Sequence, residues 1–411
     1  MSRPVPEGAS TEAAPEIFDI VVAGAGVVGL ALGAELAQAT GGGAKVLVVD
    51  PALDSRETGN RAVAIAAGSR RLLERLGAWA AIVPLAEPIL SMEIMDGGAR
   101  DAVRLTQMRF DGSRAAPLAH IAFNRDVDAA LAARCRDLGV TLRRGAVRGF
   151  APHAYTLQAE VSGAAPIRAR LLVAADGARS KLRGQAGIAS VGWDYGQSAI
   201  VATIAHERPH EGRAEQHFLP AGPFAILPLP GNRSSIVWNE AHDDARHLME
   251  LSPGDFVRQL EPRFTHRLGR IELASPARCL PLAFRIARRF VAPRLALVGD
   301  AAHLVHPLAG QGLNLGLRDV AALAQAVAGQ MRLGLDPGAA DALARYERAR
   351  RFDIAASGLG MDAMNRLFSN DIAPLRALRD FGLRLVNGAP ALKRLLIEEA
   401  SGARRTRASA A

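Results

Sequence analysis

Cysteine is scarce in this 411-residue chain, which contains only Cys135 and Cys279. Two distant cysteines offer neither a disulfide framework nor the paired thiolates of a zinc site, so we expect core or incidental thiols in a reducing compartment. Aromatic residues make up 5% of the chain, and no basic stripe interleaved with aromatic residues occurs. Nucleic acid is therefore not expected as a partner.

Long hydrophobic runs are also missing, although 49% of the residues are hydrophobic and can build substantial cores. The longest uncharged run, residues 20–34, is rich in glycine and ends at Glu35, which argues against a transmembrane helix. Residues 1–16 are rich in Pro, Ala, Ser and Glu and lack the apolar centre of a secretory signal, so they are expected to be a disordered lead. These absences favour a cytoplasmic protein.

The first motif lies near the N-terminus, where the short apolar run 19–23 leads into Gly-Ala-Gly-Val-Val-Gly at 24–29. A helical pattern at 30–39 and a second apolar run at 46–49 follow, and Asp50 ends that run. This order of strand, glycine turn, helix, strand and acid is the dinucleotide-binding pattern. The glycines permit a tight turn, close approach of the backbone to a pyrophosphate and close helix packing, while the acid bonds a ribose, in NAD and FAD alike. The cofactor contacts expected here are Gly24, Ala25, Gly26, Gly29 and Asp50.

Two further apolar runs end in an acid and a glycine. Residues 295–298 lead into Gly299-Asp300 and a glycine-dense loop, and a helix is expected to begin near Leu313. Residues 170–175 lead into Asp176-Gly177 and a basic turn. A carboxylate at a strand end can bond a ribitol or ribose hydroxyl, and glycines before a helix expose amide groups to a phosphate or an electron-rich ring. Taken alone, the first of these stretches is also compatible with an ordinary strand-to-helix junction.

Together, the three motifs resemble those of the single-component FAD-dependent aromatic hydroxylases. The resemblance implies that the first glycine motif holds the ADP half of FAD, that Gly299-Asp300 binds the ribitol end, and that Asp176-Gly177 lies near FAD and a passing NAD(P)H. From about residue 17 to residue 400 the chain resembles the ubiquinone-biosynthesis hydroxylases in particular, through residues 61–79, 303–316 and 364–393. Phe123 departs from that pattern, since an acidic residue is expected before Asn124-Arg125.

The fold class implied is mixed α/β: a Rossmann-like FAD-binding domain of the aromatic-hydroxylase type, a mixed-sheet substrate domain and C-terminal helices. Repeated short β-like runs at 187–281 support the substrate domain, and within them residues 224–229 and 234–238 predict a hairpin. Helical patterns are expected at 341–350, 352–368 and 372–386. The expected segments are the lead (1–16), three parts of the FAD-binding domain (17–80, 105–186 and 284–350), two parts of the substrate domain (81–104 and 187–283) and a C-terminal helical region (351–411).

The resemblance implies an enzyme that uses NAD(P)H and O2 to hydroxylate the aromatic ring of a polyprenylated phenol in ubiquinone biosynthesis, through a flavin C4a-hydroperoxide. FAD would be bound non-covalently, and NAD(P)H only transiently, because the sequence holds no second nucleotide-binding glycine motif. The flavin carries this chemistry, so no catalytic side chain and no metal is assigned, and His303 and His306 are expected to be structural or to lie at the flavin edge. Further cofactor contacts implied are Arg61, Arg125, Pro307 at the flavin face, Gly310, Gly312, Leu313 and Asn314.

A greasy ring substrate would need an apolar pocket, which is expected at Phe218, Phe224 and Leu227, although each of these alone is more simply explained as sheet core. Two other functions stay open: a hydroxylase of a soluble aromatic compound, and a non-catalytic flavin-binding scaffold in a quinone-biosynthesis complex. The formal net charge of +9 is carried almost wholly by arginine, which reflects either GC-rich codon use or attraction to NAD(P)H and an anionic membrane. An apolar stripe at helical spacing is formed by Met361, Met364, Leu367 and Phe368. Such a stripe is most simply explained by packing against the body of the protein, but it also suits a peripheral contact with the inner face of the cytoplasmic membrane.

Overall fold

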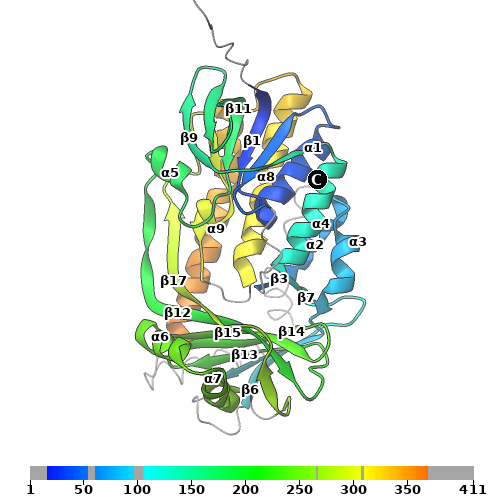
Figure 1. Ribbon diagram of the computed structural model, residues 1–411, viewed down its shortest axis with the longest axis vertical. Coiled ribbons are helices and arrows are strands. Elements are labelled where there is room, and N and C mark those ends of the chain that lie inside the picture. The colour runs from blue at the N-terminus through cyan, green and yellow to red at the C-terminus, as the bar shows by residue number, and fades with distance from the viewer. Residues whose placement is uncertain (1–15, 54–60, 97–104, 265–266, 307–309, 369–411) are drawn as a thin grey trace, which may run out of the picture.

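The computed structural model describes residues 16–53, 61–96, 105–264, 267–306 and 310–368. Two large sheets lie at opposite ends of the molecule, and a small third sheet and two long helices connect them (Figure 1). The mixed α/β class predicted from the sequence is confirmed.

The first sheet has parallel strands at its centre, in the order β19-β11-β1-β2-β8. Strands β1, β2 and β19 of this sheet read as largely apolar runs because nearly all of their residues are buried, as is usual for the strands of a parallel sheet. The eight strands are β1 (Ile17–Ala23), β2 (Val46–Asp50), β8 (Thr141–Arg144), β9 (Val147–Pro152), β10 (Leu157–Val161), β11 (Ile167–Ala174), β18 (Val291–Ala292) and β19 (Leu295–Leu297).

The second sheet contains nine strands, and its central hairpin joins β14 to β15 as predicted, with Leu229 in register with Arg233. The nine strands are β5 (Ser91–Asp96), β6 (Leu105–Asp111), β12 (Ser190–His206), β13 (Arg213–Leu219), β14 (Gly222–Leu229), β15 (Arg233–Ala241), β16 (Ile271–Leu273), β17 (Arg278–Ala287) and β20 (His303–Leu304). The small third sheet is formed by β3 (Ala62–Ala66), β4 (Glu87–Pro88) and β7 (Ala119–Phe123).

The helices cover the first sheet, link the two sheets and close the far side of the second (Figure 1). The α-helices are α1 (Val27–Ala39), α2 (Ala67–Arg75), α3 (Trp79–Ile82), α4 (Asn124–Asp137), α5 (Lys181–Gln185), α6 (His242–Glu250), α7 (Pro253–Leu260), α8 (Gln311–Arg332) and α9 (Ala340–Phe368). The described residues also form the 3-10 turns η2 (Val83–Leu85), η3 (Glu261–Arg263) and η4 (Gly299–Ala301).

Each face of the second sheet has its own core. On the outer face, apolar side chains of β12, β14 and β15 pack beneath α6 and α7. On the inner face, Ala214, Leu227 and Leu229 pack against Ala64 and Ile121 of the small sheet, which belongs to the motif-bearing half of the molecule. Side chains alternate between the two faces along a strand, so these contacts show on which face each remaining residue of these strands lies.

Two expected boundaries differ from the structure. β6 pairs with β5, so residues 105–111 lie in the second sheet and not in the FAD-binding part expected for 105–186. Helix α9 runs unbroken through the expected boundary at 350/351, since its backbone bonds continue past Arg350. The domain division as a whole stays a prediction, and the helix expected at 372–386 lies outside the described residues.

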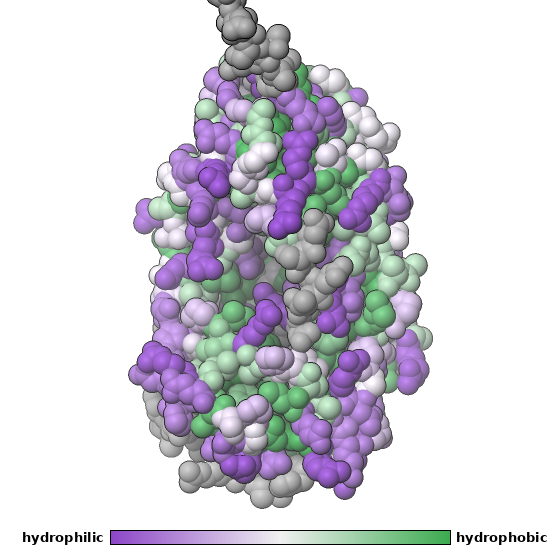
Figure 2. All heavy atoms as spheres, in the orientation of Figure 1, coloured by the Kyte–Doolittle hydropathy of each residue, from purple (hydrophilic) through white to green (hydrophobic). Residues whose placement is uncertain are grey.

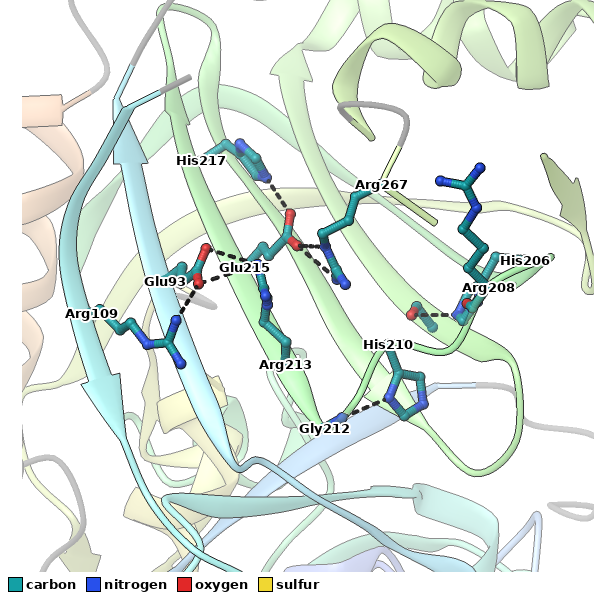
Figure 3. Close-up of polar contacts among 11 residues, drawn as sticks. Glu93, Arg109, His206, Arg208, His210, Gly212, Arg213, Glu215, His217 and Arg267 are labelled. Carbon is teal, nitrogen blue, oxygen red and sulfur yellow. Dashed lines mark hydrogen bonds and ion pairs between the residues drawn. The ribbon is translucent and has the colours of Figure 1, made fainter. Parts of the chain in front are cut away.

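A charged network ties the edge strands of the second sheet together on its outer face (Figure 3). Glu93 is 5% exposed and pairs with Arg109 of β6 and Arg213 of β13. Glu215 is 2% exposed and bonds Arg267 and His217. Buried carboxylates are tolerated where such partners replace water.

Candidate cofactor-binding site

The predicted motifs meet at one edge of the first sheet. Ala23 of β1 is in register with Ala174 of β11 and with Val49 of β2, and Ala174 is in register with Leu297 of β19. The loops that leave these four strand ends begin near Gly24, Asp50, Asp176 and Gly299. In open α/β sheets, ligands bind beyond the carboxyl ends of the strands, so motifs far apart in the sequence form one candidate site.

The first glycine loop fits a dinucleotide. Gly24 has a φ of 116°, and a Cβ there would lie 2.3 Å from the main-chain oxygen of Ala175. A Cβ at Gly29 would lie 1.9 Å from the main-chain oxygen of Gly24. Gly26 precedes α1, whose first turn has neither a capping side chain nor an acid, so its amide groups suit a pyrophosphate.

Asp50 has a structural role that its position in the sequence did not reveal. Its side chain is 4% exposed, and Oδ2 accepts a hydrogen bond from the Ala25 amide at 2.7 Å. Oδ1 accepts another from the Ala52 amide at 2.7 Å. The carboxylate therefore holds the glycine loop against the end of β2, and its contact with a ribose stays a prediction.

The second acidic motif has a carboxylate, that of Asp300, which is available to bind a ligand. Gly299 opens the turn η4 with a φ of 59°, and Asp300 in that turn is half-buried. Among the residues that the structure describes, Asp300 has no hydrogen-bond or ion-pair partner. A ribitol hydroxyl would supply one, which fits the predicted role.

The carboxylate of Asp176 has a partner already, since its Oδ2 accepts a hydrogen bond from the Lys181 amide at 3.0 Å, in the first turn of α5, whose N-cap is Ser180. Arg183 on the same helix belongs to none of the sequence motifs. It donates to the main-chain oxygens of Ala178 at 3.0 Å and Ala301 at 2.8 Å. Arg183 thus joins the Asp176-Gly177 turn to the turn that carries Asp300.

The start of α8 is fixed by Asn314, whose side chain is 2% exposed. Its Oδ1 accepts from the Ala66 amide at 3.0 Å, and its Nδ2 donates to the main-chain oxygen of Ala64 at 2.9 Å. Gly310 has a φ of 63°, and a Cβ there would lie 2.8 Å from Cβ of Ala64. The helix predicted near Leu313 begins at Gln311, and no side chain among the described residues caps it. The amide groups of Gly312 and Leu313 in its first turn are therefore open to a ligand. The Asn314 amide lies four residues after the N-cap Gly310, where the first helical hydrogen bond forms, so contact of Asn314 with FAD stays a prediction. Pro307 lies outside the described residues.

Two predicted arginines lie beside the small third sheet, Arg61 just before β3 and Arg125 just after β7. The exposed Arg61 accepts a main-chain hydrogen bond from Asn124 at 2.8 Å. The Arg125 guanidinium lies over the Phe123 ring, 4.6 Å from its centroid, and 3.5 Å from a carboxylate oxygen of Asp126. Phe123, which departs from the subgroup's pattern, therefore provides Arg125 with a cation–π partner. Contact of either arginine with FAD stays a prediction.

The prediction that Phe224 lines a substrate pocket is wrong. Phe224 is fully buried on the outer face of the second sheet, with ring centroids 6.0 Å from Phe264 and 6.4 Å from Trp238. Strand alternation turns Phe224 away from the motif-bearing half, whereas Phe218 and Leu227 lie on the inner face. Their role as a substrate pocket stays a prediction.

The two histidines occupy different environments. His303 Nε2 lies 2.6 Å from Asp319 Oδ2, and both side chains are buried. His306 is 1% exposed, its ring meets that of Tyr195 edge-on at 5.1 Å, and burial lowers its pKa to about 4. Neither ring belongs to a cluster that could hold a metal within the described part of the chain.

Comparison with known proteins agrees with this geometry. A family model described as "FAD binding domain" matches residues 18–356. The chain is 42% identical to the ubiquinone hydroxylase UbiL of Rhodospirillum rubrum, covering 97% of this chain and 93% of that protein. It is 35% identical to the 3-demethoxyubiquinol 3-hydroxylase of Escherichia coli, covering 93% and 98%, respectively.

Solved structures share the fold. The p-nitrophenol 4-monooxygenase PnpA of Pseudomonas putida superposes with a TM-score of 0.76 at 21% identity, covering 94% of this chain and 99% of that one. The FAD cofactor and the resemblance predicted from the three motifs are confirmed by these matches. The chain belongs to the family of FAD-dependent monooxygenases that includes the ubiquinone-biosynthesis hydroxylases.

Proposed function

We propose that this protein hydroxylates the aromatic ring of a polyprenylated phenol in ubiquinone biosynthesis, with NAD(P)H and O2 as co-substrates. The observation that carries the proposal is full-length similarity to relatives named as ubiquinone hydroxylases, together with an intact cofactor edge. A flavin-binding scaffold without turnover would need the same FAD-binding motifs, so activity is what separates it from an enzyme.

Different residues at the edge would hold different parts of FAD. When bound, FAD supplies the redox chemistry and the activation of O2. Amide groups at the start of α1 would bind the pyrophosphate, and Asp50 would bond the ribose. Asp300 would accept hydrogen bonds from the ribitol. Amide groups at the start of α8, including those of Gly312 and Leu313, would stabilise negative charge on the reduced ring system.

The inner face of the second sheet would receive the substrate ring. Phe218 and Leu227 supply apolar surface there. Asn239 lies on the same face, is 3% exposed, and has an Oδ1 atom without a hydrogen-bond partner among the described residues. That oxygen would accept a hydrogen bond from a ring hydroxyl, because a buried acceptor gains most from a partner where water is excluded.

Deletion and isotope labelling test the proposal. A strain without this protein should stop making ubiquinone and accumulate a prenylated intermediate that lacks one hydroxyl group. When the protein is restored under labelled O2, the new ring oxygen should carry the label. Label derived from water, or unchanged quinone levels after deletion, would rule out a monooxygenase of this pathway.

Assays with purified protein separate the remaining alternatives. NAD(P)H oxidation should be stimulated by a prenylated phenol and much less by the same phenol without its tail. Equal stimulation by both compounds would favour a hydroxylase of soluble aromatics. No stimulation by either compound would favour a scaffold.

A peripheral membrane contact would suit a lipid-tailed substrate. No helix in the described part of the chain is long and apolar enough to cross a bilayer. The net charge of +9 favours anionic lipids, and Figure 2 shows apolar residues gathered in the lower half of one face among hydrophilic ones. Of the predicted apolar stripe, Met361 packs inward against Phe284, and the other three side chains lie outside the described residues. Co-sedimentation with anionic but not neutral vesicles would support the contact, and equal binding to both would contradict its electrostatic basis.

A further inference from the structure

Asp319 is a fully buried carboxylate in the middle of α8, and it is far in sequence from every motif residue of the first half. Its Oδ2 accepts hydrogen bonds from the Gly299 amide at 2.9 Å and from His303 Nε2 at 2.6 Å. Its Oδ1 accepts from Arg350 Nε at 2.7 Å. Three donors on three different elements therefore converge on one side chain.

The packing around Asp319 holds α8 close to the turn η4. A Cβ at Gly316 would lie 2.7 Å from a side-chain carbon of Val28 and 3.4 Å from Cα of Gly299. Glycine is therefore needed one turn before Asp319 for the helix to approach. On the far side, Arg350 of α9 is 4% exposed and also donates to the main-chain oxygen of Leu315 at 3.3 Å.

Charge is balanced within this cluster. Burial raises the pKa of Asp319, but the charges of His303 and Arg350 and their hydrogen bonds outweigh burial and leave the pKa below its ordinary value. Arg350 also pairs with Asp353, which in turn lies 3.5 Å from Arg318. An ionised Asp319 is thus held in place by His303 and Arg350, and Arg350 is itself fixed by its ion pair with Asp353.

We propose that Asp319 is a positioning residue for FAD, because it anchors the chain on both sides of Asp300. Gly299 precedes Asp300 and His303 follows it, and both bond the same carboxylate oxygen. Asp300 itself has no partner among the described residues, so its direction depends on how its turn is held, by these two anchors and by the bond of Arg183 to Ala301. The inference rests on the proposed contact of Asp300 with the ribitol of FAD.

A double-mutant cycle on FAD affinity tests this inference. Asp319→Asn keeps the size and an acceptor oxygen but removes the charge, and it should raise the FAD dissociation constant about tenfold. Asp300→Ala should raise it about tenfold or more. If Asp319 acts through Asp300, the double variant should match Asp300→Ala within about twofold, because coupled residues are not additive. Binding is measured on apo protein by the quenching of flavin fluorescence.

Each outcome is decisive. Multiplied effects in the double variant, or an unchanged affinity in Asp319→Asn, would overturn the positioning role while Asp300 keeps its own. An unchanged affinity in Asp300→Ala would overturn both assignments. His303→Gln enters the same cycle if Asp319→Asn does not fold by circular dichroism. Glu347→Gln is the matched control, since Glu347 of α9 accepts from the Phe290 amide at 2.8 Å and makes no bond to the turn, so FAD affinity should stay within about twofold.

Discussion

The Ser69 hydroxyl donates a hydrogen bond to Asn314 Oδ1 at 2.7 Å, and this contact joins α2 to the start of α8 across the cofactor edge. The two residues are 245 positions apart in the chain. Through Ala64 and Ala66, the same amide side chain also holds the end of β3. The helix start that is expected to face the flavin is therefore positioned from the small third sheet.

Replacing Asn314 should destabilise the protein more than replacing Ser69. Asn314→Ala leaves several buried main-chain groups without partners, at a cost of about 1–3 kcal/mol for each unsatisfied group. Ser69→Ala removes one hydrogen bond and should cost about 1 kcal/mol. The free energy of unfolding in urea measures both variants. Equal losses would show that the main-chain bonds of Asn314 contribute little.

Substitution of Gly26 should abolish FAD binding without unfolding the protein. Gly26→Val places a side chain where the backbone must approach the pyrophosphate. Gly329→Val is the control, because a Cβ at Gly329 of α8 meets no atom within 4 Å. The absorbance of bound flavin should be lost in the first variant and kept in the second. Normal flavin absorbance in Gly26→Val would remove this loop from the cofactor site.

Acid should weaken the edge of the second sheet through Glu215 (Figure 3). Burial raises the pKa of Glu215, but its bonds to His217 and Arg267 outweigh burial and hold the pKa below the ordinary 4.5. A depressed pKa adds stability that is complete above pH 4.5 and is lost as the pH falls through the folded value. Glu215→Gln should therefore be less stable than the parent at neutral pH, with a difference that shrinks below about pH 4. The exposed Glu272→Gln should show no such dependence, and a constant difference for Glu215→Gln would contradict the ionic role.

His306 should make the protein less stable in mild acid. Its pKa falls from 6.5 to about 4 because burial disfavours the charged ring, an effect that Asp362 only partly offsets. Between these values the unfolded chain takes up a proton that the folded chain refuses, so stability is lost as the pH drops from 6.5 towards 4. Between pH 7.5 and pH 5, the melting temperature of His306→Phe should fall by less than that of the parent. The exposed His153→Phe is the control, and identical losses in all three proteins would assign the acid sensitivity elsewhere.

The motifs were predictable because each is local. Gly24 to Gly29 needs only a strand, a turn and a helix in immediate succession, and the structure forms them there. The hairpin between β14 and β15 was equally predictable from a turn between two β-like runs. Family membership and the FAD cofactor followed from the order of such local signals and were confirmed.

The face of a strand residue was harder to predict. Phe224 and Leu227 look alike as apolar residues of one strand, yet they lie on opposite faces of the sheet. Alternation alone separates them but does not say which face meets the cofactor-binding half, since that depends on what covers each side. The helices α6 and α7 cover the face that carries Phe224, so the face that carries Leu227 meets the cofactor-binding half.

The sequence by itself determined the cofactor class, the fold class and the places where the chain turns at the cofactor edge, because glycines, acids and apolar runs act through neighbouring backbone. Only the tertiary structure decided how those turns are held. Arg183, Asn314 and Asp319 bond across the site to residues distant in the chain. In the sequence, Arg183 and Asp319 read as ordinary polar residues of helices, and Asn314 was expected only as a contact of the cofactor. Their hydrogen bonds exist only because packing brings the helices against strand ends and excludes water, which makes a buried polar group depend on its partners.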